Sequence, residues 1–327
     1  MRLGAFSVLE EYEDSTPRGA RLHDAVALAR AAEAASLDSF WVAEHHFHAA
    51  GVCAAPPVVL AAAGASTTRL RLGSLVAVLP FHRPVFMAEQ YAMLDRLLDG
   101  RLNFGVGSGY IPSEFEGFGL DPAGKREAFD AALDTILRAF RGEAFSAAPG
   151  APPVRLNVLP QQQPHPPLTI AAQRREAMPY IARRGASVAL IPYATVSAVP
   201  ELAEQIREFR DHLPRGASAR VLAAVHVYAG PDPARARRAL QRYLDSRLST
   251  QSTFYQAKVA HEPSHARAEV LEEAGLALLG SPQQVRDRAD AFARAGVDVL
   301  LGIFDFGGLP VDEAAASMRR LGPLFAD

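Results

Sequence analysis

Three ionisable side chains, Glu44, His45 and His46, directly follow the apolar run Phe40 to Ala43. That run is typical of a buried strand, so the charged residues mark the point where the backbone leaves the core. In proteins that alternate strands and helices, ligands and chemistry usually gather at this carboxyl end of a strand. Because adjacent strand residues point in opposite directions, we expect only one of the two histidines to face the site.

Metal binding is a rival interpretation of these histidines. His46 and His48 have the spacing of the paired histidines in metal-dependent barrel hydrolases, which take further ligands from later strands. Here the later strand ends offer Ala172-Gln173 and Pro192-Tyr193, which cannot complete a zinc or iron shell. We therefore expect no metal. A purely structural, hydrogen-bonded role for one of the neighbouring histidines stays open.

A glycine-rich turn follows another strand-like run. Glycines spaced by two allow backbone amides to approach an anion or a flat ring closely. The pattern lacks the dinucleotide-binding fingerprint, and a tight turn without a ligand is the plain alternative. Its position after a strand favours contact with a cofactor through Gly107, Ser108, Gly109 and Tyr110.

Two arginines, Arg174 and Arg175, lie between a strand-like run and a helix-like segment. Free amides at a helix start and guanidinium groups both bind phosphate well. The alternative is that the pair is simply solvated. The strand ends are otherwise aromatic and apolar, which suits a flat, largely apolar ligand with one anionic end.

Strand-like and helix-like patterns alternate along nearly the whole chain. Proline opens and glycine closes the helix between Pro84 and Gly100, and Ser281 to Gln284 resembles a capping box for a helix that ends at Gly296. Other helices are expected at 21–35, 56–68, 125–140, 176–184 and 200–212. The expected strands are 3–9, 39–43, 71–79, 102–106, 168–171, 187–191, 221–228 and 297–304.

Eight strands, each followed by a helix, predict an α/β fold of the (β/α)8 TIM barrel type. The surplus length fits insertions after the fourth strand, at 145–167, and before the eighth strand. We expect a single domain over residues 1–327. A doubly wound open sheet is the competing architecture, but it would place a phosphate-binding turn after the first strand, where Glu10 to Asp14 would repel phosphate.

Composition excludes several classes of function. A formal net charge of −2 over 327 residues argues against nucleic acid or an anionic membrane surface as the main partner. The first residues are too quickly polar for a secretory signal, and no run of apolar residues is long enough to span a membrane. A single cysteine, Cys53, fits a reducing compartment. We expect a cytoplasmic protein.

The sequence resembles the bacterial luciferase-like flavin monooxygenases over essentially its whole length. These proteins are (β/α)8 barrels that use reduced FMN or, in one branch, the deazaflavin coenzyme. The blocks that carry the resemblance keep the family's order and spacing: Glu44-His45-His46-Phe47, Arg71-Leu72-Gly73-Ser74, Val78-Leu79-Pro80, Gly100-Arg101, Phe104-Gly105-Val106-Gly107 and Glu114-Phe115.

The resemblance implies a role for each matching residue. His45 matches the catalytic histidine beside the flavin, a candidate general acid/base because imidazole titrates near neutral pH. Glu44 would orient or charge-balance the site, and Leu75-Val76 matches a frequent non-prolyl cis peptide behind the isoalloxazine. The cofactor-contacting positions are Gly107, Ser108, Gly109, Tyr110, Gln173, Arg174, Arg175 and Tyr193.

Some positions depart from the family pattern. The light-emitting members carry a reactive cysteine followed by an arginine where this chain has Gly107-Ser108. This removes a phosphate contact, which Arg174 or Arg175 could supply, and any basis for expecting light emission. The stretch from Ser246 to Gly275 corresponds to the family's mobile active-site loop, and its polar composition fits a lid that excludes water.

The resemblance thus implies a monooxygenase that receives reduced FMN from a separate reductase. The flavin would react with dioxygen to give a flavin-4a-hydroperoxide that oxygenates a small organic substrate. A deazaflavin-dependent oxidoreductase and a non-catalytic flavin-binding barrel stay as alternatives. Family members commonly dimerise through helices that match Pro56 to Thr68 and Pro84 to Leu98, so a homodimer is expected. The substrate itself does not follow from the sequence.

Overall fold

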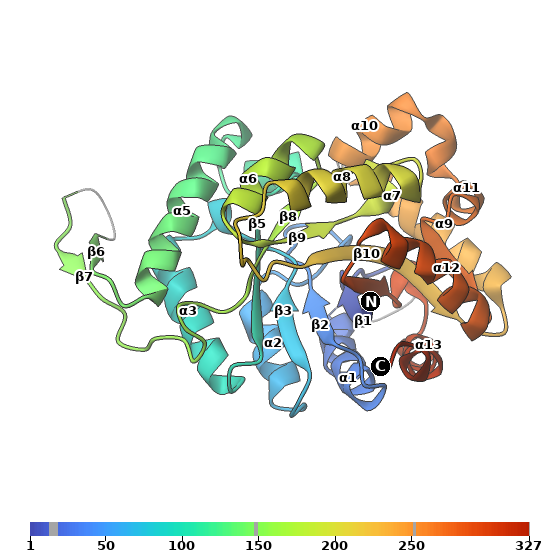
Figure 1. Cartoon of the computed structure of the whole chain (residues 1–327), viewed down its shortest axis with the longest axis horizontal. Helices are drawn as coiled ribbons and strands as arrows, with labels where there is room; N and C mark the ends of the chain where they lie inside the picture. The colour runs from blue at the N-terminus through green and yellow to red at the C-terminus, as the bar shows by residue number, and fades with distance from the viewer. Residues whose placement is uncertain (13–18, 147–149, 251–252, 327) are drawn as a thin grey trace.

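Eight parallel strands close into a barrel in the computed structural model of the chain, which describes residues 1–12, 19–146, 150–250 and 253–326 (Figure 1). Closure is made by the first and last strands, since Arg2 pairs with Val299 and the ladder continues to Ala5 and Gly302. The predicted (β/α)8 fold is confirmed, and the open sheet is excluded. In order around the barrel the strands are β1 (Arg2–Ser7), β2 (Ser39–Val42), β3 (Arg71–Ser74), β5 (Leu102–Gly107), β8 (Leu168–Ala172), β9 (Ser187–Leu190), β10 (Val221–Ala229) and β12 (Val299–Ile303).

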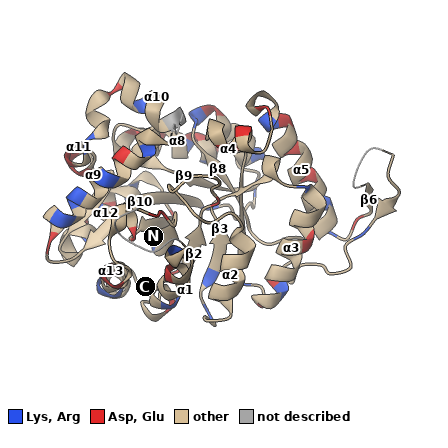
Figure 2. Cartoon of the chain, turned by 180° about the vertical axis from the view of Figure 1, so that it is seen from behind, with Lys and Arg blue, Asp and Glu red and all other residues tan. Residues whose placement is uncertain are grey.

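Burial on both faces explains why the strands are largely apolar. All nine residues of β10 are buried, as expected for a parallel strand that has side chains inside the barrel and helices outside. Lys, Arg, Asp and Glu are spread over the surrounding helices instead (Figure 2). The longer helices are α1 (Ala20–Ala34), α2 (Pro56–Gly64), α3 (Pro84–Leu97), α5 (Lys125–Phe140), α8 (Val199–Asp211), α9 (Pro233–Ser249), α12 (Pro282–Ala295) and α13 (Val311–Phe325).

Local end signals set the helix boundaries closely. The Ser281 hydroxyl accepts from the Gln284 amide, the Gln284 side chain accepts in return, and Gly296 ends α12 in the left-handed region. The expected helix 56–68 is four residues too long, because α2 ends at Gly64. The Arg101 guanidinium donates to the carbonyls of Gly64 and Thr67 and so binds the carbonyl groups that the helix end leaves free.

The third strand is not the continuous run 71–79 that the sequence predicts. It divides into β3 and β4 (Ala77–Val78), and the Leu75-Val76 peptide between them is cis, as the family resemblance implies. Gly73 is level with Asn103 on β5, whereas Ala77 is level with Val106. Four residue steps from β3 to β4 therefore match three steps along β5, so the chain bulges between β3 and β4.

The two insertions lie where the sequence places them. The first, between β5 and β8, contains α4 (Pro112–Gly117), α5 and a hairpin of β6 (Phe145–Ser146) and β7 (Pro153–Val154) that projects from the barrel (Figure 1). The second contains α9, α10 (Thr253–His261), α11 (Ala268–Glu273) and a strand that was not expected, β11 (Ala277–Gly280). This strand pairs with the carboxyl half of β10. No helix among the described residues is both long and apolar enough to cross a membrane.

The close approach of the bulge to β5 gives a test of the fold. A methyl group at Gly105 would lie 1.9 Å from the Ser74 carbonyl oxygen. We expect Gly105→Ala to lower the free energy of unfolding by about 3 kcal/mol, because backbone must move to relieve the overlap. Gly124→Ala is the control, since its new carbon would meet no heavy atom within 4 Å and its φ of −85° suits alanine. Urea unfolding measures both, and a Gly105→Ala protein as stable as the wild type would contradict the packing.

Candidate active site at the carboxyl ends of the strands

A cavity of about 340 Å³ opens where the carboxyl ends of the barrel strands meet, a size that is typical of small-molecule sites. Every strand of the barrel except β10 contributes its last residues or residues of the loop that follows it. After β10, the contribution comes from residues of helix α9. The lining is mainly apolar or aromatic, with a small polar set: Glu44, His45, Ser108, Glu114, Lys125, Arg126, Gln173, Arg174 and Arg247.

His45 lines this cavity, and its ring is held by a carboxylate from another element. Its Nδ1 lies 3.0 Å from Oε1 of Glu114 on α4, and the ring packs against Gly51, where a Cβ would lie 2.6 Å from Cδ2. The same carboxylate oxygen accepts from the backbone amide of His46 and from Nε2 of His48. Glu114 is therefore bound by three donors.

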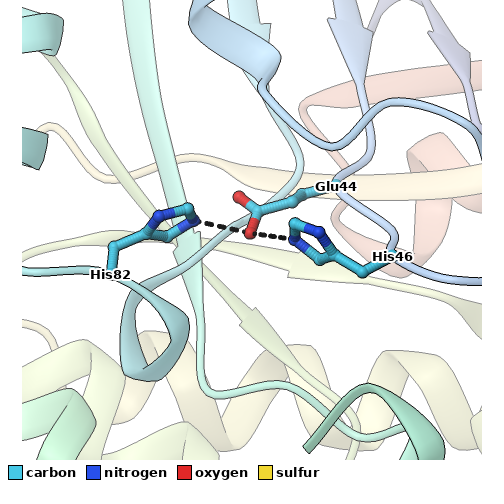
Figure 3. A group of neighbouring side chains, drawn as sticks. All are labelled: Glu44, His46 and His82. Carbon is cyan, nitrogen blue, oxygen red and sulfur yellow. Dashed lines mark hydrogen bonds and ion pairs between the residues drawn. The ribbon is translucent and has the colours of Figure 1, made fainter. Parts of the chain in front are cut away.

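Glu44 contacts other histidines than His45. Its Oε1 lies 2.9 Å from Nε2 of His46 and 2.7 Å from Nε2 of His82, so its carboxylate stands between two imidazoles (Figure 3). Its other oxygen accepts from the Val78 amide, which ties the strand β4 after the cis peptide to the end of β2. Glu44 thus orients His46 and His82 and positions the cavity wall.

The histidines divide as strand alternation predicts. His45 lines the cavity and His46 does not. His46 and His48, the pair considered for a metal, contact different carboxylates. Each belongs to a separate group whose potential ligand atoms lie within 4.8 Å of one another: Glu44, His46 and His82 in one, and His45, His48 and Glu114 in the other. In both groups the carboxylate already accepts hydrogen bonds from its imidazoles. The expectation of no metal stays a prediction.

Burial sets the protonation of the central pair. Burial lowers the pKa of His45, and the hydrogen bond to Glu114 only partly opposes it, so the imidazole is neutral near pH 7. Burial alone would raise the pKa of Glu114, but the bonds from His45 and His48 lower it to about 2. An ionised carboxylate only accepts, so Nδ1 of His45 carries the proton and Nε2 is the basic nitrogen.

Nearly all the residues that the sequence singles out meet in this cavity. Leu75, Val76, Gly107, Ser108, Gly109, Tyr110, Gln173, Arg174 and Tyr193 join Glu44 and His45 in its lining. Arg175 does not. Its guanidinium pairs with Glu208 at 2.6 Å and with Glu204 at 3.5 Å, because the turn at the start of η3 (Arg175–Ala177) directs consecutive side chains apart. Of the two arginines considered for a phosphate, only Arg174 is at the cavity.

The structure adds residues that the sequence analysis missed. Glu114 belongs to a block that carries the resemblance, so that block was the available signal for its role. Lys125 and Arg126 begin α5 and join Arg174 in the lining, which concentrates three cations there. Nothing in their local sequence separates them from surface residues.

The expected lid region, 246–275, is largely helical. It spans the end of α9, then α10 and α11, with residues 251–252 outside the described residues. Tyr255 of α10 is fully buried and donates to the His265 carbonyl, and its ring lies 5.4 Å from that of Tyr193 in the cavity wall. Closure over the cavity stays a prediction.

The strand ends of this (β/α)8 barrel carry a largely apolar cavity, an imidazole hydrogen-bonded to a carboxylate, and several cationic side chains. This combination is typical of a class of small-molecule enzymes. The family model described as luciferase-like monooxygenase matches residues 1–299. The chain belongs to this family. The resemblance read from the sequence is confirmed.

The curated relatives include named monooxygenases. Limonene 1,2-monooxygenase of Rhodococcus erythropolis is 33% identical over 143 residues, which is 44% of this chain and 37% of that protein. The chain spans about half the length of the first curated relatives it matches.

Three solved structures share the fold over the whole chain. Monooxygenase RslO1 from Streptomyces bottropensis has a TM-score of 0.82 at 23% identity, with full coverage of both chains. The oxygenating constituent of 3,6-diketocamphane monooxygenase from Pseudomonas putida, in complex with FMN, has a TM-score of 0.81 at 18% identity. The match covers 100% of this chain and 98% of that chain. An F420-dependent secondary alcohol dehydrogenase has a TM-score of 0.77 at 18% identity, and the match covers 100% of this chain and 99% of that chain. At these identities the likeness establishes the fold.

Glu114 gives a pH-dependent test of the site. A carboxyl group whose pKa is lowered on folding, from 4.5 to about 2, stabilises the fold fully above pH 4.5 and loses that effect as the pH falls toward 2. We expect Glu114→Gln to cost about 3 kcal/mol of unfolding free energy at pH 7 and progressively less below pH 4.5. Exposed Glu116, replaced in the same way, is the control. A cost for Glu114→Gln that is independent of pH in urea unfolding would contradict the arrangement.

Proposed function

We propose that this protein is a flavin-dependent monooxygenase that takes reduced FMN from a separate reductase and uses dioxygen to oxygenate a small organic substrate. The observation that carries the proposal is the neutral imidazole of His45, held by Glu114 in the wall of an apolar cavity. Family membership supports monooxygenation, and the cations at the cavity support a phosphorylated cofactor.

The residues present fit FMN. Arg174, Lys125 and Arg126 would hold the phosphate, since cations and charge-assisted hydrogen bonds are what a phosphate requires. Gly107 faces Val76 so closely that a Cβ would lie 2.7 Å from Cγ2, which leaves a smooth wall for a flat ring. The remaining ring and chain contacts would come from Leu75, Ser108, Gly109, Tyr110, Gln173 and Tyr193. When bound, the reduced flavin supplies the two electrons with which dioxygen yields one inserted oxygen atom and water.

The chain's own residues manage protons and water. His45 would accept or return a proton at Nε2, because Glu114 fixes the proton on Nδ1. Glu44 does not act on the substrate in this proposal; it holds His46, His82 and the strand that carries the cis peptide. Buried tyrosines and aliphatic side chains would exclude water, because access of solvent favours release of hydrogen peroxide over oxygenation of the substrate.

A separate reductase is proposed because the chain lacks the nicotinamide-binding fingerprint. The solved diketocamphane enzyme is described as an oxygenating constituent, which fits the same division of labour. Rapid reduction of FMN by NADPH with this protein alone would contradict the division.

Two other functions use the same cavity. The F420-dependent neighbour favours a deazaflavin-dependent oxidoreductase as second candidate. Mixing the protein with FMN or with the deazaflavin coenzyme, and recording which absorption band shifts, separates the two. The third candidate is a flavin-binding barrel without turnover, and the oxygenation assay below distinguishes it from the proposed monooxygenase.

We also propose that the chain is one cytoplasmic barrel domain that forms a homodimer. Helix α3 exposes Phe86, Met93 and Leu97 at helical spacing, and the adjacent helix α2 exposes Val58. Their exposed fractions run from 53% to 70%, an apolar face that a second copy of the chain would cover. The buried thiol of Cys53 is consistent with a reducing compartment.

Cofactor binding tests the phosphate assignment. We expect Arg174→Gln to weaken FMN binding about tenfold or more, because a charge-assisted hydrogen bond is lost. The neighbouring change Arg175→Gln is the matched control, since Arg175 pairs with Glu208 and is not in the cavity lining. Flavin fluorescence titration gives both dissociation constants. Equal effects of the two changes would exclude Arg174 as the phosphate ligand.

Oxygenation tests the whole proposal. With a flavin reductase and NADPH present, oxygen uptake and product analysis over several substrate classes should reveal an oxygenated product. His45→Asn should lower the rate of product formation about 100-fold or more while FMN still binds. Oxygen would then be diverted to hydrogen peroxide. No oxygenated product with any class, alongside normal FMN binding, would favour the non-catalytic binder.

The dimer has a separate test. Light scattering should give twice the mass of the chain, and Leu97→Glu should shift the protein toward the monomer by placing a charge in the apolar face. Val154→Glu, on the projecting hairpin, changes an exposed apolar residue in the same way and serves as the control. A monomeric wild-type mass would remove the proposal.

A further inference from the structure

His48 shares a carboxylate oxygen with the proposed base. It lies in the loop between β2 and α2, and its Nε2 is 3.0 Å from Oε1 of Glu114. Nδ1 of His45 lies at the same distance from the same oxygen, and the centroids of the two rings are 5.4 Å apart. His48 is not in the cavity lining. A residue that does not face the cavity therefore contacts the carboxylate that holds His45.

Other contacts fix the loop that carries His48. The His45 amide donates to the Cys53 carbonyl at 3.0 Å, which closes the loop at its base. Arg247 of α9 is buried and donates from Nη2 to the Ala50 carbonyl at 2.5 Å, which ties the loop to a distant helix. The position of His48 thus does not depend on its own bond to Glu114.

The direction of the bond from His48 follows from its partner. An ionised carboxylate only accepts, so the hydrogen that His48 shares with Glu114 is on Nε2. Nδ1 of His48 is buried and has no hydrogen-bond partner among the described residues. A proton on that nitrogen would be a buried donor without an acceptor, which is costly. His48 therefore donates through Nε2 alone.

This shared oxygen limits how strongly Glu114 can favour a proton on His45. A carboxylate beside an imidazole favours the charged imidazolium and makes the ring more basic. Here the charge on Oε1 is already stabilised by His48 and by the His46 amide at 2.9 Å. These donors reduce what the carboxylate gains when His45 becomes charged. An imidazole that stays neutral can accept a proton from a reacting group, and an imidazolium cannot.

The other titratable and charged groups around His45 do not replace this effect. Burial is the largest influence on the pKa of His45 and lowers it, and the charge of Arg247 acts in the same direction. The ring of Tyr110 meets His45 edge-on, with centroids 6.2 Å apart, and burial raises the pKa of its hydroxyl. Glu44 is bound to other histidines. Among the described residues, Glu114 is thus the group that favours a charged His45 ring.

We propose that His48 is a positioning residue that, by donating to the carboxylate oxygen that His45 also contacts, keeps the His45 imidazole available to accept a proton at Nε2. The inference rests on the proposed function, because it takes His45 as the group that moves protons. A purely structural His48 would hold its loop in place without changing how readily His45 takes up a proton.

Two amides of different length provide the test. Glutamine at position 48 places its side-chain N–H groups near the position of Nε2 and can still donate to Glu114, whereas asparagine places them near Nδ1, out of reach. Nitrogen NMR of the imidazole rings, on the full chain without flavin, gives the pH at which His45 titrates, and His45→Asn assigns its signals. We expect this midpoint to rise by about 0.5 pH unit or more in His48→Asn and to stay within about 0.2 pH unit in His48→Gln.

A matched change in the neighbouring network is the control. His82→Asn shortens an imidazole that donates to Glu44 instead of Glu114. It should leave the His45 midpoint within about 0.2 pH unit of the wild type, because Glu44 does not contact the His45 ring.

The pH dependence of oxygenation is the second readout. The acidic limb of kcat/KM, measured with a reductase present, should move to higher pH in His48→Asn. The rate should fall about threefold or more below the midpoint and recover above it, since a shift of half a pH unit changes the neutral fraction by that factor. A structural defect would lower the rate by the same factor at every pH.

The outcomes are distinguishable. An unchanged His45 midpoint in His48→Asn overturns the inference, and so does an equal rise in His48→Gln or in His82→Asn. A loss of rate that is independent of pH also overturns it. Because the NMR titration needs no turnover, a midpoint that rises only in His48→Asn supports the effect of His48 on His45 even if no substrate is oxygenated. In that case the proposed monooxygenase function fails and the contact stands.

Discussion

The hydrogen-bonded closure of β1 onto β12 is the constraint on which the site depends. Closure forces all eight strands to end on one rim, so that residues from Phe6 to Ile303 line a single cavity. An open sheet with the same strands would spread these residues along an edge. The chemistry of this protein is therefore a consequence of topology first and of individual side chains second.

Within that rim, two buried carboxylates divide the histidines. Glu114 binds His45 and His48, and Glu44 binds His46 and His82. Each carboxylate stays ionised because imidazole and amide donors outweigh the cost of its burial. Glu114 fixes the tautomer of His45 at the cavity, and Glu44 fixes the part of the wall that contains the cis peptide. The tripeptide Glu44-His45-His46 thus supplies both an imidazole that lines the cavity and a carboxylate that ties the wall together.

The charged side chains of the cavity lining differ in how they are paired. Lys125, Arg126 and Arg174 contribute cations to the lining, and Arg126 also pairs with Asp130 at 3.4 Å. Arg247 is paired with the buried Glu10. Most of the other lining residues are apolar or aromatic. In the proposed function, the cations bind the phosphate of the cofactor and the apolar lining keeps water from the reacting groups.

The sequence by itself determined the eight-strand alternation, most helix ends, the two insertions and the family, because periodicity, proline, glycine and capping residues act locally. It also identified His45 and nearly all of the cavity-lining positions that lie directly after strands. Only the tertiary structure decided that Glu114 and not Glu44 holds His45, that Arg174 and not Arg175 reaches the cavity, and that Arg247 is buried beside Glu10. These outcomes depend on contacts between residues that are far apart in the chain, or on the direction of a single turn, and neither leaves a periodic signal in the sequence.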